Sequence, residues 1–309
     1  MMISVIVPCF NEEEVIPYFY EAMEKVRREM EEEFEYLFVN DGSKDGTLKV
    51  LRQLATEDTK VRYLSFSRNF GKEAALYAGL QEAQGDLITV MDVDLQDPPE
   101  MLIEMKALLE VNSDLDCVGT RRVSRDGEPP IRSFFAKLFY KLMNRISQVE
   151  VVDGARDFRL MRRQMVDAIL SVSEYNRFSK GIFAWIGFET KYLPYKNVER
   201  VAGATSWSFW KLLSYSVEGI INFSDTPLNL ASYTGFFTFL LSLVLMALIV
   251  FKTLVFGEAT IGWPSTICII LFLGGLQLMT IGILGKYLAK VFLETKKRPI
   301  YIIKEKSSN

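Results

Sequence analysis

The segment VIVPCFNEE, residues 5–13, begins with an apolar, β-branched run and ends in polar residues. Such a run is typical of a buried strand, and the helical spacing of apolar residues from about 13 to 31 predicts a helix after it. Beyond the first strand at residues 4–7, we expect strands at 36–39, 61–66, 87–91 and 116–119, and helices at 47–55, 72–83 and 99–109. Strands that alternate with helices in this way predict βαβ units and a mostly parallel α/β sheet.

The composition excludes several kinds of site. The chain has 309 residues and a formal net charge of -3, so nucleic acid is not expected as a partner. It contains no histidine, which excludes imidazole bases and histidine metal sites. Its three cysteines, Cys9, Cys117 and Cys268, are too scattered for a disulfide framework or a tetrahedral zinc site. Catalysis must therefore use carboxylates, lysine, arginine, hydroxyl groups or a metal held by oxygen ligands.

Polar loops follow three of the predicted strands, at residues 8–13, 40–46 and 92–99. Each loop alone fits ordinary turn and helix-cap chemistry. Together they favour a binding site, because ligands of such sheets lie beyond the carboxyl ends of the strands. Asp92 and Asp94 lie on one side of an extended chain, and an oxygen-only pair suits Mg²⁺ or Mn²⁺ on a diphosphate rather than zinc.

Two runs without a charged residue, 226–251 and 259–285, are each long enough to span a membrane. We therefore expect a first transmembrane helix at 226–256, an external loop at 257–263, a second transmembrane helix at 264–288 and a basic cytoplasmic tail at 289–309. The positive charge after the second run predicts that the tail and residues 1–205 share the cytoplasmic side of a multi-pass cell-membrane protein.

Two further segments have apolar and aromatic residues at helical spacing, at 131–146 and 206–223. We expect the first to be a basic amphipathic helix and residues 206–225 to form a juxtamembrane amphipathic helix. Packing on the soluble core would explain the apolar stripes equally well. The aromatic and basic content beside two membrane spans favours placement at the bilayer interface.

Five segments, taken in order, resemble the family 2 glycosyltransferases of the GT-A fold. They are VIVPCFNEE (5–13), VNDGSKDGT (39–47), SRNFGKE (67–73), MDVDLQDPPE (91–100) and DGARDFRL (153–160). Within that family the chain is similar to polyprenyl-phosphate glycosyltransferases related to dolichol-phosphate mannose synthase, and its two C-terminal spans resemble the bacterial undecaprenyl-phosphate members. The resemblance implies a Rossmann-like GT-A catalytic domain over residues 1–205.

The resemblance also implies roles for particular residues. The nucleotide sugar would be bound by Pro8, Asn11, Glu13, Asp41, Ser43, Lys72 and Asp92. Mg²⁺ or Mn²⁺ and the diphosphate would be held by Asp92, Asp94 and Gln96. Asp157 matches the family's catalytic-site aspartate, with Asp94 as the second catalytic carboxylate, although spacing alone fits a helix cap at Asp157 equally well.

A lipid phosphate acceptor would suit a site without histidine, because a phosphate monoester is largely anionic at pH 7 and needs no general base. Arginines would bind that phosphate, and the candidates are Arg121, Arg122, Arg132 and Arg200. We favour Arg121 and Arg132, with Arg200 in a segment that resembles the family's Arg–Gly–hydroxyl–Lys segment. Ser206 occupies the position where the family commonly has lysine. Asp157 would orient the acceptor or stabilise positive charge at the anomeric carbon.

The expected function is inverting transfer of one sugar, glucose or N-acetylglucosamine, from a UDP-sugar to undecaprenyl phosphate for cell-envelope glycan modification. The other partners it allows are membrane lipid, a second copy of the chain, and a flippase or downstream transferase. A processive polysaccharide synthase is disfavoured because there is no Gln-x-x-Arg-Trp segment and only two spans. A non-catalytic membrane scaffold with a degenerate transferase domain is the remaining alternative.

Overall fold

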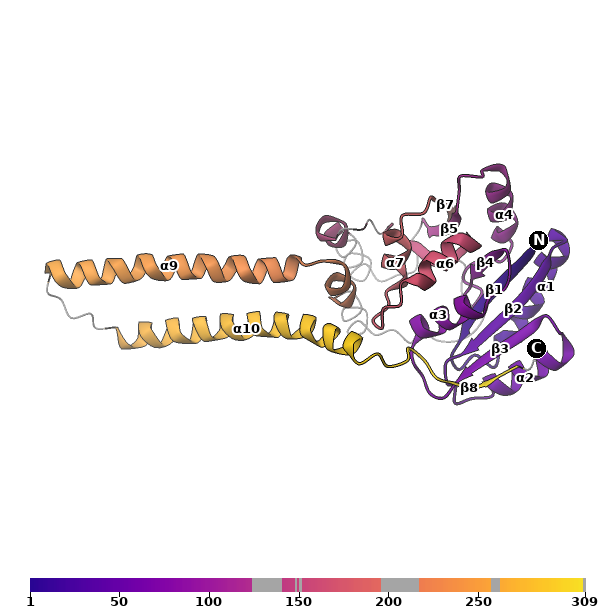
Figure 1. Cartoon of the computed structure of the whole chain (residues 1–309), viewed down its shortest axis with the longest axis horizontal. Coiled ribbons are helices and arrows are strands. Elements are labelled where there is room, and N and C mark those ends of the chain that lie inside the picture. The colour runs from indigo at the N-terminus through magenta and orange to yellow at the C-terminus, as the bar shows by residue number, and fades with distance from the viewer. Residues whose placement is uncertain (124–140, 148, 150–151, 196–216, 257–261, 308–309) are drawn as a thin grey trace.

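The computed structural model describes residues 1–123, 141–147, 149, 152–195, 217–256 and 262–307. A sheet with helices on both faces forms one end of the molecule, and two long helices extend from it (Figure 1). The strands are β1 (Met2–Cys9), β2 (Glu33–Asn40), β3 (Val61–Phe66), β4 (Leu87–Val90), β5 (Cys117–Arg122), β6 (Ala155–Arg162), β7 (Thr190–Tyr195) and β8 (Ile303–Lys306). The helices are α1 (Ile16–Met30), α2 (Thr47–Glu57), α3 (Lys72–Glu82), α4 (Met101–Val111), α6 (Arg163–Ser171), α7 (Ser179–Trp185), α9 (Thr226–Phe256) and α10 (Trp263–Thr295).

The sheet has the strand order β7-β5-β6-β4-β1-β2-β3-β8. Strands β4, β1, β2 and β3 are parallel, so their carboxyl ends meet at one edge. Strand β6 is antiparallel to both β4 and β5, and therefore begins at the edge where they end. The prediction of a mostly parallel α/β sheet is confirmed. The sequence did not predict β6, β7 or β8.

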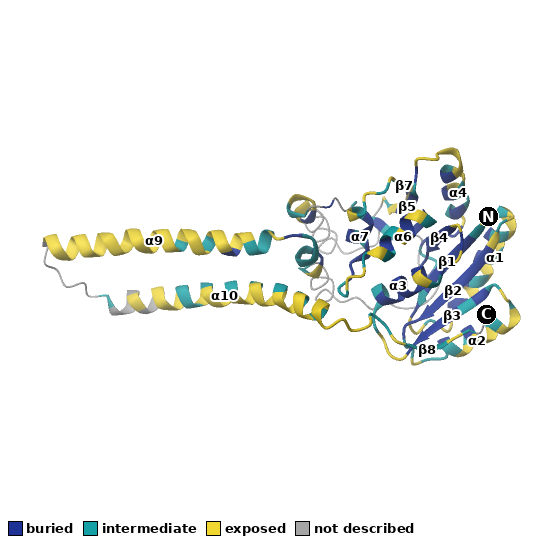
Figure 2. Ribbon diagram, viewed as in Figure 1, coloured by how far each residue is buried: buried dark blue, intermediate teal, exposed yellow. Residues whose placement is uncertain are grey.

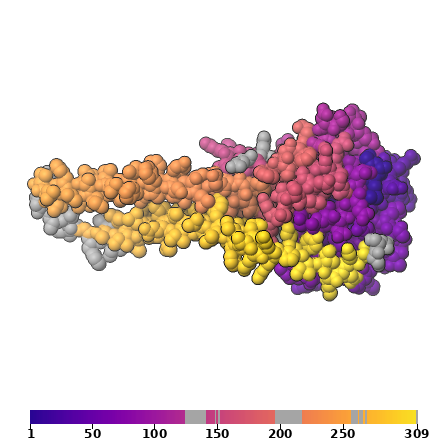
Figure 3. Space-filling view, viewed as in Figure 1, coloured from indigo at the N-terminus to yellow at the C-terminus, as the bar shows by residue number. Residues whose placement is uncertain are grey.

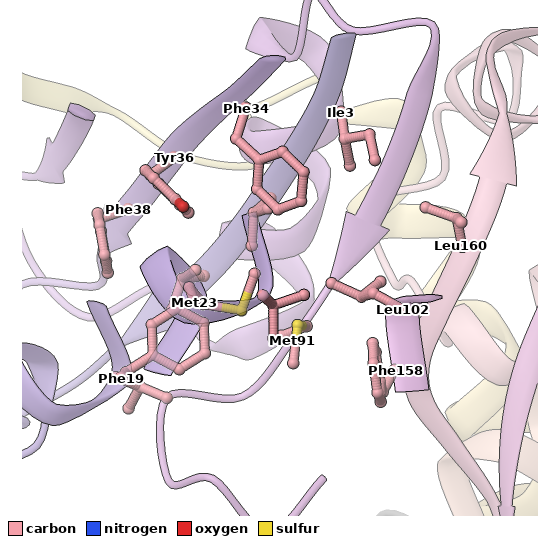
Figure 4. Close-up of a cluster of buried hydrophobic side chains, with 14 of the residues drawn as sticks. Ile3, Phe19, Met23, Phe34, Tyr36, Phe38, Met91, Leu102, Phe158 and Leu160 are labelled. Atoms are coloured by element: carbon pink, nitrogen blue, oxygen red, sulfur yellow. The ribbon is translucent and has the colours of Figure 1, made fainter. Parts of the chain in front are cut away.

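Apolar layers hold helices against both faces of the sheet. Helix α1 buries Phe19 and Met23 against the strands, and Leu102 of α4 lies in the same cluster (Figure 4). Helix α3 is buried on nearly all sides between the strands and α6. A Cβ on Gly79 would lie 2.2 Å from Cγ2 of Ile6, so this glycine permits the close approach of α3 to β1. The buried strands between the two helix layers are evident in Figure 2.

Helices α9 and α10 run side by side away from the sheet and form an extended stalk (Figure 3). Within them, residues Thr226–Val255 and Ile269–Thr295 are long and apolar enough to cross a membrane. Their apolar side chains are mostly exposed, as Figure 2 shows, which suits contact with lipid rather than with a protein core. The start of α9 and the end of α10 lie at the end of the stalk that is nearer the sheet (Figure 1), and α10 continues to Thr295, beyond residue 288 where the sequence analysis ends the second span.

The chain after α10 returns to the sheet, where β8 pairs antiparallel with β3. The Tyr301 ring stacks on Phe66 with 4.9 Å between ring centroids. Glu305 accepts hydrogen bonds from Nε and Nη2 of Arg52, at 2.8 and 2.5 Å, and from the Tyr63 hydroxyl at 2.7 Å. The segment expected as a basic tail therefore contributes an edge strand to the sheet.

The predicted amphipathic helices are described only in part. Residues 141–146 and 217–223 are helical, and the remainder of 131–146 and 206–223 lies outside the described residues. The two described parts pack together, with Met143, Ile220 and Phe223 in one cluster around Phe178, the residue before α7. They lie on the side of the sheet from which α9 and α10 extend (Figure 1).

Candidate active site

The loops after β1 and β2 are joined by hydrogen bonds that involve predicted site residues. The Asn11 amide donates to Oγ of Ser43 at 2.9 Å, and Asn11 Oδ1 accepts from the Lys44 amide at 2.9 Å. The Gly46 amide donates to the Glu13 carboxylate at 2.6 Å. Asn11 has a φ of 57°, a left-handed conformation that asparagine tolerates better than most residues. Asn11, Glu13 and Ser43 therefore lie together beyond the end of β1, the strand that contains Pro8.

Asp41 directly follows β2 and fixes the loop that precedes α3. Its buried carboxylate accepts hydrogen bonds from the backbone amides of Phe70 at 2.6 Å and Gly71 at 2.9 Å. Burial raises the pKa of Asp41, which the two amide hydrogen bonds partly counteract. Gly42 has a φ of 65°, and a Cβ there would lie 2.3 Å from the carbonyl carbon of Arg68. The Asp41 turn and the 68–71 loop are thus in direct contact, immediately before Lys72.

Lys72 joins two carboxylates that lie far apart in the sequence. Its Nζ lies 2.6 Å from Asp92 Oδ1 and 2.7 Å from Asp157 Oδ2. The antiparallel register pairs Val90 of β4 with Arg159 of β6, so continuing it by two residues places Asp92 opposite Asp157. The side chains of Lys72, Asp92 and Asp157 remain 37%, 28% and 20% exposed, respectively, which leaves the cluster open to a ligand.

The charges of this cluster hold one another ionised. Burial alone would raise the pKa of Asp157, but the nearby charges of Lys72 and then Lys180 lower it well below the usual carboxyl range. Burial would likewise lower the pKa of Lys72, but Asp157 and Asp92 outweigh it and raise that pKa well above its usual value. Asp157 is therefore a fixed negative charge near neutral pH and a weak base.

The turn after β4 supplies the predicted metal ligands. Asp94 is 9% exposed, and its Oδ1 accepts a hydrogen bond from the Gln96 amide at 3.1 Å, around Leu95 with a φ of 54°. Across the described part of the chain, no group of three or more acidic or cysteine side chains could hold a metal by itself. One or two carboxylates completed by substrate phosphate oxygens is the usual magnesium arrangement, and the Asp92–Asp94 donor set fits it.

Several residues that the sequence analysis missed fix this turn. Asp97 is buried, with its Oδ1 3.1 Å from Arg156 Nε, and it accepts a hydrogen bond from the Tyr195 hydroxyl. Asp97 thereby ties the acidic turn to β6 and β7. The quoted motif contains Asp97, but its partners are distant in sequence, so only the fold reveals its contacts.

A second missed group lies beside Lys72 and Asp157. The carboxylate of Glu73 accepts hydrogen bonds from the Ser179 amide, at 3.0 and 3.2 Å, and from the Ser179 hydroxyl. The next residue, Lys180, donates from Nζ to the Ala155 carbonyl at 3.0 Å. These contacts hold the start of α7 against the carboxylate cluster. No motif in the sequence marks either residue of α7.

The arginines predicted to bind the acceptor are only partly described. Arg121 lies at the end of β5 opposite Ala155, with its Nε 3.0 Å from the Asp153 carbonyl oxygen, and its side chain is exposed. Arg122 follows it with its backbone amide bound to Gly154. Arg132 and Arg200 lie outside the described residues. Arg121 is thus at the same sheet edge as Asp157, whereas the acceptor role of all these arginines remains a prediction.

A mostly parallel sheet with an acidic turn at its carboxyl edge and an antiparallel strand beside it defines the GT-A class of glycosyltransferase. The model of the family described as glycosyl transferase family 2 matches residues 4–170, more than half of the chain. The chain therefore belongs to this family, as the resemblance of its motifs implied, and is a transferase.

Similar proteins cover nearly the whole chain. A putative glycosyltransferase CsbB of Bacillus subtilis (strain 168) is 43% identical over 304 residues, which cover 98% of this chain and 92% of that one. The SfII prophage-derived bactoprenol glucosyl transferase of Shigella flexneri is 43% identical over 305 residues, covering 99% and 98%. Among solved structures, the mannosyltransferase PcManGT from Pyrobaculum calidifontis, in complex with GDP-Man and Mn²⁺, is 16% identical, covers 93% of this chain and 86% of its own, and has a TM-score of 0.51. This likeness shows the shared fold.

Proposed function

We propose that this protein transfers glucose from UDP-glucose to a polyprenyl phosphate, undecaprenyl phosphate in bacteria, with inversion at the anomeric carbon. The observation that carries the proposal is the Lys72 ammonium joining Asp92 and Asp157 at the carboxyl edge of the sheet. Two long apolar helices beside this edge support a lipid acceptor. The name of the Shigella relative, a bactoprenol glucosyl transferase identical at 43% of positions, supports glucose over N-acetylglucosamine.

The acceptor must supply a nucleophile that needs no strong base. Asp157 is held ionised by Lys72 with a pKa well below its usual range, so it would remove a hydroxyl proton poorly. A phosphate monoester with a second pKa near 6 is mostly dianionic at neutral pH and attacks without losing a proton. The electrostatics of Asp157 therefore favour a phosphate acceptor over a sugar hydroxyl.

In the proposed step, an acceptor phosphate oxygen forms a bond to the anomeric carbon while the bond from that carbon to the β-phosphate oxygen breaks. UDP leaves with the bonding electron pair, and direct in-line displacement inverts the anomeric centre. The negative charge of Asp157 would stabilise positive charge developing at that carbon. The ammonium of Lys72 keeps Asp157 ionised and in place.

A divalent metal, Mg²⁺ or Mn²⁺, would be held by Asp92, Asp94 and Gln96 and would supply positive charge to the departing diphosphate. The loops with Pro8, Asn11, Glu13, Asp41 and Ser43 would bind the uracil and ribose. Arg121, Arg132 and Arg200 are the arginines that we propose for the acceptor phosphate. The basic residues near the end of α10 favour a cytoplasmic active site in a protein that crosses the membrane twice.

A donor panel tests this proposal. Full-length protein in detergent would be given undecaprenyl phosphate with UDP-glucose, UDP-N-acetylglucosamine or GDP-mannose, and the lipid product identified by mass spectrometry. We expect a hexosyl lipid from UDP-glucose, with the β configuration by NMR because UDP-glucose is the α anomer. The Asp94→Asn variant is the control for background transfer.

Faster transfer from UDP-N-acetylglucosamine would contradict the sugar assignment, and an α-linked product would contradict inversion. Polymeric product would favour a processive synthase. Absence of turnover with all three donors, in protein that still binds its lipid partner, would favour the scaffold alternative.

A further inference from the structure

We propose that the ammonium group of Lys180 binds the phosphate of the lipid acceptor during transfer. The proposal rests on the proposed function and names a residue that neither the motifs nor the arginine candidates include. Lys180 is the second residue of α7, and its Nζ donates a hydrogen bond to the Ala155 carbonyl at 3.0 Å. Ala155 lies two residues before Asp157 on β6, so the ammonium lies near Asp157, beside which the proposed transfer would take place.

Lys180 differs from Lys72 in its partners. Lys72 has two carboxylates within 2.7 Å and is neutralised by them. Among the described residues, Lys180 forms no ion pair, and its hydrogen bond goes to a neutral carbonyl oxygen. An ammonium carries three N–H donors, so donors remain for an anionic ligand. The charge of Lys180 acts on Asp157 only through space, so a phosphate at this position would give Lys180 a direct anionic partner, as the carboxylates do for Lys72.

A buried arginine adds positive charge on the same side of Asp157. Arg159 is only 2% exposed, and its Nε and one terminal nitrogen have no hydrogen-bond partner within the part of the chain that the structure describes. Its guanidinium lies over the Phe183 ring of α7, 3.6 Å from the centroid. Arg159 and Lys180 therefore both place positive charge between α7 and β6. This field favours an incoming phosphate dianion over a neutral acceptor.

The segment around Lys180 also touches the membrane-side helices. A Cβ on Gly181 would lie 2.4 Å from the Phe223 ring, so this glycine lets the helix before α9 pack directly on α7. The Phe178 and Phe223 rings lie 5.9 Å apart. Since residue 223 is three residues from the start of the apolar span at Thr226, Lys180 lies between the membrane side of the protein and Asp157.

The end of α10 fixes the loop that leads to Lys180. The Tyr175 amide donates to the Glu294 carboxylate at 2.8 Å, and Lys290 Nζ lies 3.1 Å from Asn176 Oδ1. The same second span that anchors the protein thus positions the start of α7. A phosphate held in the plane of the lipid headgroups would meet Lys180 before it reaches the sugar donor.

The test separates acceptor binding from every other step. Lys180→Gln, Lys180→Arg and the control Lys191→Gln, an exposed lysine on β7, would be prepared as full-length protein in detergent. Undecaprenyl phosphate binding and UDP binding with Mn²⁺ would be measured beside transfer. Loss of a charge-assisted hydrogen bond predicts that Lys180→Gln weakens acceptor binding and acceptor kcat/KM by about 10- to 100-fold.

We expect Lys180→Arg to recover most of this loss, and the control to match the wild type. The loss should be larger at pH 8 than at pH 5, because the phosphate is a dianion only above its second pKa near 6. A purely structural lysine would not produce that pH dependence. UDP binding should stay within about twofold of wild type in Lys180→Gln, well below the tenfold change expected for the acceptor.

Acceptor binding by Lys180→Gln within twofold of wild type would overturn the proposal, and so would an equal loss of UDP binding. Because lipid phosphate binding is measured without turnover, failure of the proposed function is a separate result. Wild-type protein that binds undecaprenyl phosphate through Lys180 but transfers no sugar would refute the function and leave this contact intact.

Discussion

Replacing Asp157 by asparagine removes one negative charge from the cluster while keeping the shape of the side chain. In the proposed mechanism that charge faces positive charge that develops at the anomeric carbon. At about 4 Å and an effective dielectric of about 20, two unit charges interact by about 4 kcal/mol. Asp157 keeps 20% of its surface exposed, so this figure is an upper limit. We therefore expect kcat to fall by about 10²- to 10³-fold, at about 1.4 kcal/mol per tenfold.

The same substitution distinguishes charge placement from general-base catalysis. Lys72 lowers the pKa of Asp157, so the wild-type carboxylate stays ionised from pH 6 to pH 9 and does not titrate in that range. The loss in Asp157→Asn should therefore persist at every pH in the range. The assay is the initial rate of lipid-linked sugar formation at saturating UDP-glucose and undecaprenyl phosphate at pH 6, 7, 8 and 9.

A variant rate that climbs with pH and approaches the wild-type rate at pH 9 would refute this reasoning and restore Asp157 as a base. Stability provides an independent check on the sign of the pKa shift. Because the folded pKa of Asp157 is depressed, its pairing with Lys72 stabilises the fold fully above the unfolded pKa of about 3.9 and is lost as pH falls through the folded value. The stability difference between wild type and Asp157→Asn should accordingly shrink in acid, measured by denaturant unfolding below pH 4.

Asp94→Asn should lower turnover at least about 100-fold without unfolding the protein. A chelator should abolish wild-type activity until Mg²⁺ or Mn²⁺ is added. An unchanged rate in the chelator would contradict the metal assignment. Tyr301→Ala removes an aromatic pair with Phe66 that usually contributes about 0.5–1.5 kcal/mol. The Ser67 amide, which donates to the Ile302 carbonyl at 3.0 Å, should then exchange its hydrogen up to about tenfold faster, as measured by mass spectrometry. Unchanged exchange would argue that β8 does not stabilise the edge of the sheet. A cysteine replacing Thr260 should be labelled by an impermeant thiol reagent in intact cells, whereas labelling only after lysis would reverse the proposed orientation.

Local patterns were enough to predict the parallel half of the fold and the position of its acidic turn. The β-branched runs and helical spacing predicted β1 to β5 and α1 to α4, because these strands and helices alternate regularly along the chain. The role of Asp157 could not be read in the same way, since it depends on the direction of β6. An antiparallel β6 begins at the edge where β4 ends and places Asp157 opposite Asp92, and nothing in the spacing specifies that direction.

The edge strand β8 was missed for a different reason. It has four residues, too few for a clear alternating pattern, and its partner is distant: the Tyr63 amide donates to the Ser307 hydroxyl across 244 residues. Charge patterning suggested a basic tail, yet Glu305 makes the specific contacts with Arg52 and Tyr63. Strand pairing between residues this far apart in the sequence depends on where α10 ends relative to the sheet, which only the assembled fold determines.

The segment after α10 connects the two long apolar helices to the candidate active site. The chain leaves α10 and binds β3, whose following loop holds Asp41 through the Phe70 and Gly71 amides and leads into Lys72. The last turns of α10 separately hold the loop before α7, through Glu294 and Lys290. The second span is therefore tied to both sides of the carboxylate cluster, to the loop that supplies Lys72 and to the helix that supplies Lys180. A catalytic domain on a flexible tether would meet a lipid phosphate in many orientations. In the proposed function, both attachments would hold the active site at a fixed height and tilt relative to the bilayer, so that the acceptor phosphate would arrive already oriented toward the anomeric carbon.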